Sequence, residues 1–195
     1  MKRSLKFLVG VVFLLWTAVS WADPYSNTAA LFHKAGQSGD FFETAYGYAV
    51  FPTIGKGGFG VGAAHGRGRV YEQGRYIGTT VMNQISVGLQ LGGQAYSQIV
   101  FFEDKRALDD FTSGNFEFGA DASAVAVTAG ASASAGTTGT SAGASGGKND
   151  ATTTGKYYKG TVVFTIVKGG AMYQAAIAGQ TFTFTPKNAS RRKKE

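Results

Sequence analysis

The sequence predicts an α+β domain in which short helices pack on a glycine-rich antiparallel sheet, sandwich- or barrel-like in form. Apolar and β-branched residues alternate with polar ones over several segments after residue 47, which is typical of half-buried strands. Glycine supplies 29 of the 195 residues, about twice the usual share, and favours tight turns and closely approaching strands over helices. Helical spacing is confined to short segments. A chain of this length is expected to form one domain around a single core.

Three segments carry helical signals. The first, at 26–36, has apolar residues at helical spacing and ends at a glycine. The second runs over 40–47, with Glu43 as a capping-box partner for the residue three positions earlier. The third covers 103–111, where Glu103 or Asp104 can cap the first turn. All three are short enough to lie on a sheet without forming a layer of their own.

The remaining periodic segments predict strands and turns. We expect a strand at 48–52 that ends at its proline, and a turn followed by a narrow strand within 55–70. Residues 79, 81, 83, 85, 87 and 89 share one mostly apolar face of a further strand. More strands are expected at 94–102, 157–167, 171–178 and 181–185, with glycine-type hairpin turns at 168–170 and 179–180.

The beginning of the chain predicts export. Lys2, Arg3 and Lys6 precede an apolar run at 7–16, and Ser20 and Ala22 supply small residues at positions −3 and −1. Residues 1–22 therefore have the form of a signal peptide cleaved near Ala22. The apolar run is shorter than the roughly 20 residues of a membrane-spanning helix. The sequence has no cysteine, which excludes disulfides, thiolate metal sites and a lipoprotein anchor. We therefore expect a periplasmic or envelope-associated protein.

Two further segments lie outside the predicted core of the domain at 23–186. Residues 130–147 are all alanine, serine, glycine or threonine. They offer too little apolar surface to offset the entropy of ordering, so a mobile loop is expected. Residues 187–195 hold five bases and one acid and predict a disordered basic tail. We favour a solubilising role for this tail over a role in binding.

The positive charge of the chain is unevenly distributed. Lysine and arginine total 19 against 12 aspartate and glutamate, a formal charge of +7. The signal peptide accounts for +3 of this and the tail for +4, which leaves 11 bases and 11 acids in residues 23–186. The domain itself is thus neutral, and any electrostatic attraction to a partner depends on local segregation of charge.

Two stretches of the domain are locally basic. Residues 51–78 contain four bases and one acid, and residues 148–168 contain four bases and one acid. If both lie on the same side of the sheet, they form a cationic face among aromatic residues, which suits an anionic lipid headgroup with rings at the interface. Scattered surface charges without a common target explain the composition equally well.

The sequence offers little for catalysis. Its two histidines, His33 and His65, lie in different predicted elements without a nearby carboxylate pattern, and no nucleophile elbow or nucleotide-binding glycine motif is present. We expect no enzyme activity, no cofactor, no metal and no nucleic acid. Two alternatives stay open: a small outer-membrane β-barrel or structural envelope protein, and a hydrolase that uses His65.

Several motifs occur in an order and spacing that cover roughly residues 27–185. They are Ala45-Tyr46-Gly47-Tyr48-Ala49-Val50-Phe51-Pro52, Gly55-Lys56-Gly57-Gly58-Phe59-Gly60-Val61-Gly62, Gly66-Arg67-Gly68-Arg69-Val70-Tyr71, Gly88-Leu89-Gln90-Leu91-Gly92-Gly93-Gln94-Ala95-Tyr96-Ser97 and Ile99-Val100-Phe101-Phe102. Ala107 to Phe111 and Gly119 to Ser123 also fit. With these motifs the chain resembles the SYLF domain, also called the Ysc84-type domain, in the form of an exported bacterial member.

The resemblance implies a non-enzymatic lipid-binding module. Eukaryotic members of the family bind phosphoinositides and, in yeast, actin, whereas exported bacterial members bind lipid at the cell envelope. By this resemblance Lys56, and more loosely Arg67 and Arg69, are expected to contact an anionic headgroup. Phe51 or Phe59 is expected to supply the aromatic ring at the membrane interface. Actin is not expected as a partner of an exported protein. Further basic contacts are expected from Arg75, Lys156, Lys159 and Lys168.

Overall fold

The computed structural model describes residues 23–118, 126–129, 157–170 and 179–188, and these form one α+β domain as predicted. The helices are α2 (Pro24–His33), a 3-10 turn (Gln37–Gly39), α3 (Phe41–Thr44) and α4 (Lys105–Thr112). The strands are β1 (Gly47–Glu72), β2 (Arg75–Phe102), β3 (Phe116–Glu117), β4 (Ala126–Ala129), β5 (Thr161–Gly170) and β6 (Gln180–Pro186). The predicted signal peptide at 1–22, loop at 130–147, strand at 171–178 and tail beyond residue 188 lie outside the described residues.

A hairpin of two long strands, β1 and β2, forms the centre of the fold. Gln73 and Gly74 connect the strands with φ angles of 46° and 76°, the left-handed conformations that a two-residue hairpin turn requires. The predicted end of the first strand at Pro52 is wrong. The pairing skips from Phe51 to Ile54, so the proline occupies a bulge, where its missing N–H costs no ladder hydrogen bond.

Strand β2 pairs along both of its edges. On one edge it pairs with β1 along the hairpin, and on the other it pairs with β6 through residues 78–84 and with β5 through residues 94–102. Strand β3 extends the sheet beyond β6, and β4 extends it in parallel beside β5. All pairs except β4 with β5 are antiparallel. The predicted hairpin turn at 168–170 is wrong, because β5 continues through these residues.

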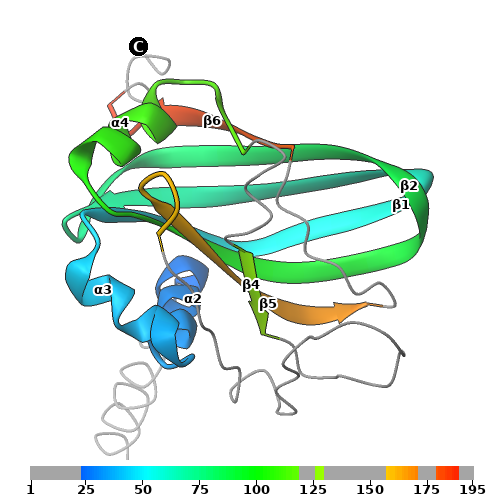
Figure 1. The fold of residues 1–195 in the computed structure, drawn as a ribbon, viewed down its shortest axis with the longest axis horizontal. Helices are drawn as coiled ribbons and strands as arrows, with labels where there is room; N and C mark the ends of the chain where they lie inside the picture. The colour runs from blue at the N-terminus through cyan, green and yellow to red at the C-terminus, as the bar shows by residue number, and fades with distance from the viewer. Residues whose placement is uncertain (1–22, 119–125, 130–156, 171–178, 189–195) are drawn as a thin grey trace, which may run out of the picture.

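The hairpin curls so that its two halves face each other (Figure 1), and the bend lies at the end of the molecule away from the helices. The two ends of β1 meet, since the Tyr46 hydroxyl donates a 2.9 Å hydrogen bond to Glu72 and the backbone N–H of Gln73 bonds to the Tyr46 carbonyl. A Cβ atom on Gly68 would lie 2.7–3.0 Å from the ring of Phe51. The glycine content therefore permits one half of the strand to lie directly against the other.

Two clusters of apolar side chains hold this arrangement together. The inner cluster joins both halves of the hairpin with α4 and β6, and includes Phe51, Val70, Met82, Val100, Phe102, Phe111 and Phe182. The outer cluster packs α2 and α3 against the other side of the sheet, and includes Phe32, Phe41, Val50, Ile99, Phe101 and Phe164. One half of the sheet is thus covered on both faces, whereas the outward side chains at 61, 63, 65 and 67 on β1 are exposed.

The helices differ from prediction at their ends. Helix α2 begins at Pro24, ahead of the predicted start, because proline suits the first helical position and Asp23 precedes it. Helix α3 has a single turn, and the Asp40 side chain makes no cap hydrogen bond, so the predicted capping box does not form. Helix α4 agrees with prediction, since the Asp104 carboxylate accepts a 2.8 Å hydrogen bond from the backbone N–H of Ala107.

Candidate functional site

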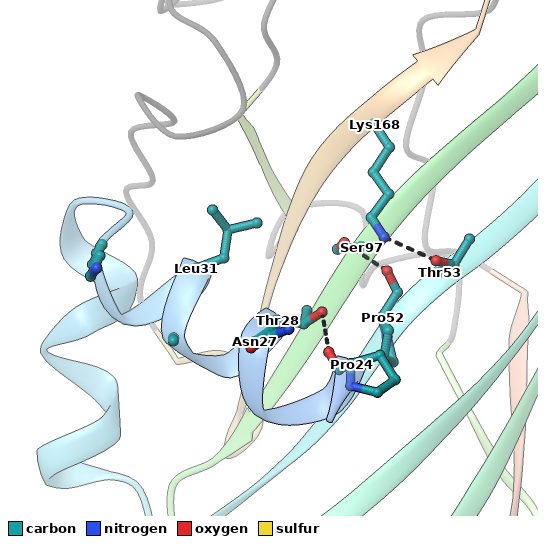
Figure 2. Close-up of a pocket in the computed structure, with 10 residues that line it drawn as sticks. Pro24, Asn27, Thr28, Leu31, Pro52, Thr53, Ser97 and Lys168 are labelled. Atoms are coloured by element: carbon teal, nitrogen blue, oxygen red, sulfur yellow. Dashed lines mark hydrogen bonds between the residues drawn. The ribbon is translucent and has the colours of Figure 1, made fainter. Parts of the chain in front are cut away.

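A pocket of about 440 Å³ lies between α2 and the neighbouring strands of the sheet. Figure 2 shows Thr28 and Leu31 on α2 and Lys168 on β5, which approach the groove from facing elements. The described residues that line the pocket are Pro24, Asn27, Thr28, Ala30, Leu31, Lys34, Pro52, Thr53, Ser97 and Lys168. The lining thus combines apolar surface, neutral polar groups and two lysines.

Hydrogen bonds fix several of the polar groups in this pocket. The Lys168 ammonium donates to the Thr53 hydroxyl at 2.9 Å. The hydroxyls of Thr28 and Ser97 donate to the backbone carbonyls of Pro24 and Pro52, both at 2.8 Å. The protons of these two hydroxyls are therefore committed to backbone carbonyls, whereas Lys168 presents an ammonium.

The predicted headgroup residue Lys56 lies inside the curled sheet. Its side chain is 5% exposed, and its register partner on β2 is Gln94. Burial lowers the pKa of its ammonium below the usual 10.5. Lys56 therefore does not reach the outer surface that a membrane would contact.

Arg67 and Arg69 lie two residues apart on β1 and share its outer face. Arg67 is exposed. Arg69 pairs with Asp23 and stacks over the ring of Tyr25, with its guanidinium carbon 4.2 Å from the ring centroid. The structure thus brings together two of the three predicted headgroup residues, and one of these two already has an acidic partner.

The further basic contacts are spread over the molecule. Arg75 is exposed beside the hairpin turn, 3.8 Å from the Glu72 carboxylate. Lys159 is exposed on the turn before β5, with its ammonium 5.2 Å from the ring centroid of Tyr158. Lys168 lines the pocket, and Lys156 lies outside the described residues. A single cationic face that contains all of these residues is not observed among those described.

The two aromatic residues predicted at the interface have opposite environments. Phe51 is completely buried in the inner cluster, so its predicted role at a membrane interface is wrong. Phe59 is 81% exposed, close to the bend of the hairpin, and it is accompanied by Val61 at 58% and Ile85 at 76%. The alternating pattern placed Ile85 on the mostly apolar face of its strand, but the buried face is the opposite one, which carries Thr80, Met82 and Gln84.

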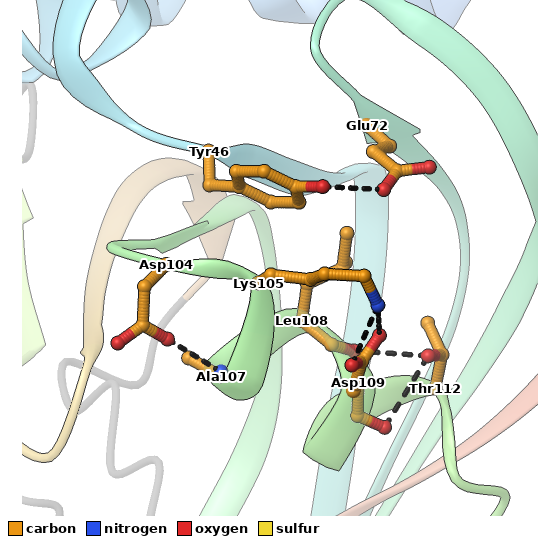
Figure 3. Close-up of polar contacts among 8 residues, drawn as sticks. All are labelled: Tyr46, Glu72, Asp104, Lys105, Ala107, Leu108, Asp109 and Thr112. Atoms are coloured by element: carbon orange, nitrogen blue, oxygen red, sulfur yellow. Dashed lines mark hydrogen bonds and ion pairs between the residues drawn. The ribbon is translucent and has the colours of Figure 1, made fainter.

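The histidines and the acidic residues of α4 form no catalytic cluster. His65 is exposed, and its Nδ1 lies 2.8 Å from the Asn83 amide oxygen, while the ring of His33 contacts that of Phe42. On α4, Lys105 binds Asp109 at 2.7 Å (Figure 3), as expected for a solvated helix face. In the described part of the chain, no group of three or more histidine, aspartate or glutamate side chains is placed to hold a metal, and no helix has the length and apolar character to cross a bilayer.

A comparison of the chain with protein families identifies one family that matches it. Residues 83–191, more than half of the chain, match the family described as "Ysc84: Las17-binding protein actin regulator". The chain therefore belongs to the Ysc84, or SYLF, family, which confirms the resemblance of its motifs. Members of this family are linked to lipid and actin binding.

A curated relative is "Beta cell expansion factor A" from Aeromonas veronii. It is 28% identical to this chain over 155 residues, which cover 78% of this chain and 51% of the relative. The chain thus spans about half the length of this curated relative.

Proposed function

We propose that the protein is exported to the cell envelope and binds anionic lipid surfaces there without catalysing a reaction. The observation that carries this proposal is the group of exposed apolar side chains Phe59, Val61 and Ile85 near the bend of the hairpin. Large apolar side chains gathered on a soluble surface mark interaction sites. Membership of a family linked to lipid binding supports a membrane as the partner.

The charge carried by the two long strands supports an anionic surface. Strands β1 and β2 contain four bases and only one acid, Glu72, which lies at the last position of β1. Arg67 is exposed on the same strand as Val61, and at the alternating spacing of a strand both project from its outer face. We call Phe59, Val61, Ile85 and Arg67 the membrane strip. A basic residue on the same strand face as apolar side chains fits the boundary between anionic headgroups and acyl chains.

Co-sedimentation with vesicles tests the proposal. Vesicles that contain phosphatidylglycerol are expected to bind the protein more tightly than vesicles of phosphatidylcholine alone, and added salt is expected to weaken the binding because it screens the attraction. The double change Phe59→Ser with Ile85→Ser removes most of the exposed apolar surface and is expected to weaken binding about tenfold. Both residues are exposed, so the fold tolerates the change.

Arg67→Gln is expected to weaken binding to the anionic vesicles by severalfold, since each basic side chain near an anionic surface contributes about 1 kcal/mol. Arg106→Gln provides a charge-matched control, because Arg106 is exposed on α4 at the end of the molecule away from the bend. Wild-type sedimentation of the Phe59→Ser, Ile85→Ser double variant would exclude the membrane strip as the binding surface.

Export is tested separately by the mass and location of the protein in its host. Removal of residues 1–22 and release in the periplasmic fraction are expected. An intact amino terminus in the cytoplasmic fraction would contradict this part of the proposal.

A further inference from the structure

The pocket between α2 and the sheet has the charge of an anion site. Its volume of about 440 Å³ falls within the range of small-molecule sites, ~300–1,000 Å³. The charged residues among its described lining are Lys34 and Lys168, and that lining contains no acid. Asp23, which precedes the lining residue Pro24 in the chain, is paired with Arg69. The negative charge of Asp23, next to the lining in the sequence, is therefore balanced by Arg69.

The polar groups of the pocket are suited to phosphate oxygens. Lys168 is oriented by its 2.9 Å bond to Thr53, and the Thr53 hydroxyl, which accepts this bond, can donate its own proton to a ligand. Asn27 adds an amide from α2. Hydrogen bonds from an ammonium to an anionic oxygen are stronger than those between neutral groups. Lys168 and Thr53 therefore form the polar end of the site.

The remaining lining is apolar. Pro24, Ala30 and Leu31 supply it from α2, and Pro52 supplies it from the bulge of β1. An inorganic anion would leave this surface in water, whereas a ligand with a hydrocarbon portion would cover it and gain the corresponding free energy. A pocket with both a cationic end and an apolar wall therefore favours an amphiphile over a free ion.

We propose that this pocket binds a single phosphate-bearing amphiphile, with the phosphate at Lys168 and Thr53 and the hydrocarbon portion against Leu31 and Pro52. The inference rests on the proposed function for the chemical class of the ligand, but it concerns a different surface from the membrane strip. Lys34, at the C-terminal end of α2, adds a second positive charge to the same pocket. The site would hold one lipid molecule independently of attachment to a bilayer.

The test is a calorimetric titration of the protein, purified as its host processes it, with dihexanoyl phosphatidic acid below its micelle concentration. Glycerol 3-phosphate and inorganic phosphate serve as ligands without a hydrocarbon portion. We expect saturable binding of the lipid at least about tenfold tighter than that of either small phosphate. Equal affinity for all three would overturn the amphiphile in favour of a plain anion site, and the absence of saturable lipid binding would overturn the site itself.

Variants locate the binding in the pocket. Lys168→Gln is expected to weaken lipid binding about tenfold. Ala30→Trp, at an exposed position of α2 that lines the pocket, fills the space without a change of charge and is expected to abolish binding. Lys187→Gln removes one exposed positive charge outside the pocket lining and is expected to bind as wild type does. Wild-type affinity in both pocket variants would overturn the proposal.

The Phe59→Ser, Ile85→Ser variant separates this site from the membrane strip. It is expected to bind the monomeric lipid with wild-type affinity while it loses attachment to vesicles. Loss of monomeric lipid binding in this variant, with its fold intact by circular dichroism, would overturn the proposed pocket. If this variant bound both vesicles and monomeric lipid as the wild type does, the result would contradict the membrane strip of the proposed function but not the proposed pocket.

Discussion

The side chains of Gln98 and Gln180 exchange two hydrogen bonds, of 2.9 Å and 3.2 Å, inside the curled sheet. Gln98 lies on the part of β2 that pairs with β5, and Gln180 begins β6, which pairs with the other end of β2. Both side chains are buried, and Gln180 also donates to the Tyr96 hydroxyl at 3.2 Å. This pair joins the two halves of the sheet where the apolar core gives way to polar side chains.

Replacing one member of the pair is expected to cost more than replacing both. Gln98→Leu leaves the Gln180 amide without this partner in a buried site, a loss of about 1–3 kcal/mol in the free energy of unfolding. The double variant with Gln180→Leu replaces both amides by apolar groups and is expected to recover part of that loss. Urea denaturation of the wild type, both single variants and the double variant measures the coupling. Strictly additive effects would show that the pair does not act as a unit.

Gly68 is expected to tolerate no larger residue, because a Cβ atom there would lie within 2.7–3.0 Å of the Phe51 ring. Gly68→Ala should destabilise the domain by about 1–3 kcal/mol through overpacking, a fall of roughly 2–4 °C in Tm per kcal/mol. Gly55→Ala, on the same strand, is the matched control, since a Cβ atom there meets nothing within 4 Å. An equal effect at both positions would contradict the close contact between the halves of β1.

The sequence predicted where strands and helices occur, but not how the sheet curls. The alternation of apolar residues located most strands, and the capping residue Asp104 located the start of α4 within two residues. The continuation of β1 through Pro52 depends on a bulge in its pairing with β2, which no local pattern of residues reveals. The mostly apolar face at 79–85 is not the buried one, because the interior near the bend accepts polar residues such as Gln84.

The candidate site was predicted less completely than the fold. The strand expected within 55–70 contains Arg67 and Arg69, and the structure places both on one face of β1. The partner of Arg69 is Asp23, 46 positions away in the sequence, and only the tertiary fold brings the two together. The pocket joins α2, β1, β2 and β5, so its lining lacks any local motif that could have identified it.

Lys56 is expected to reduce stability at neutral pH, because its buried ammonium has a lowered pKa. The unfolded chain binds this proton more tightly than the folded protein does. The loss in free energy of unfolding is therefore complete at pH values below the pKa of Lys56 in the folded protein, and it disappears as the pH rises through the usual 10.5. Lys56→Met should therefore raise Tm at pH 7. Its advantage over the wild type should shrink as the pH approaches 10.5. Thermal denaturation across this pH range measures the difference in Tm between Lys56→Met and the wild type. A difference that grows with pH would contradict a buried ammonium.

The guanidinium of Arg69 is expected to hold α2 against the sheet. It pairs with Asp23 at the start of that helix and stacks on Tyr25 in its first turn. A lysine at this position keeps the charge but lacks the planar group that stacks on an aromatic ring. A stacked cation and a partly exposed ion pair together contribute about 1 kcal/mol.

Arg69→Lys should accordingly accelerate hydrogen exchange of the α2 backbone amides by about fivefold, because local opening of the helix becomes easier. Arg67→Lys is the control, since Arg67 is exposed on the same strand and face and its replacement should leave exchange in α2 unchanged. Because α2 also forms one wall of the pocket, Arg69→Lys should weaken binding of the short-chain lipid. Exchange rates in α2 that are the same in both variants would show that Arg69 does not anchor the helix.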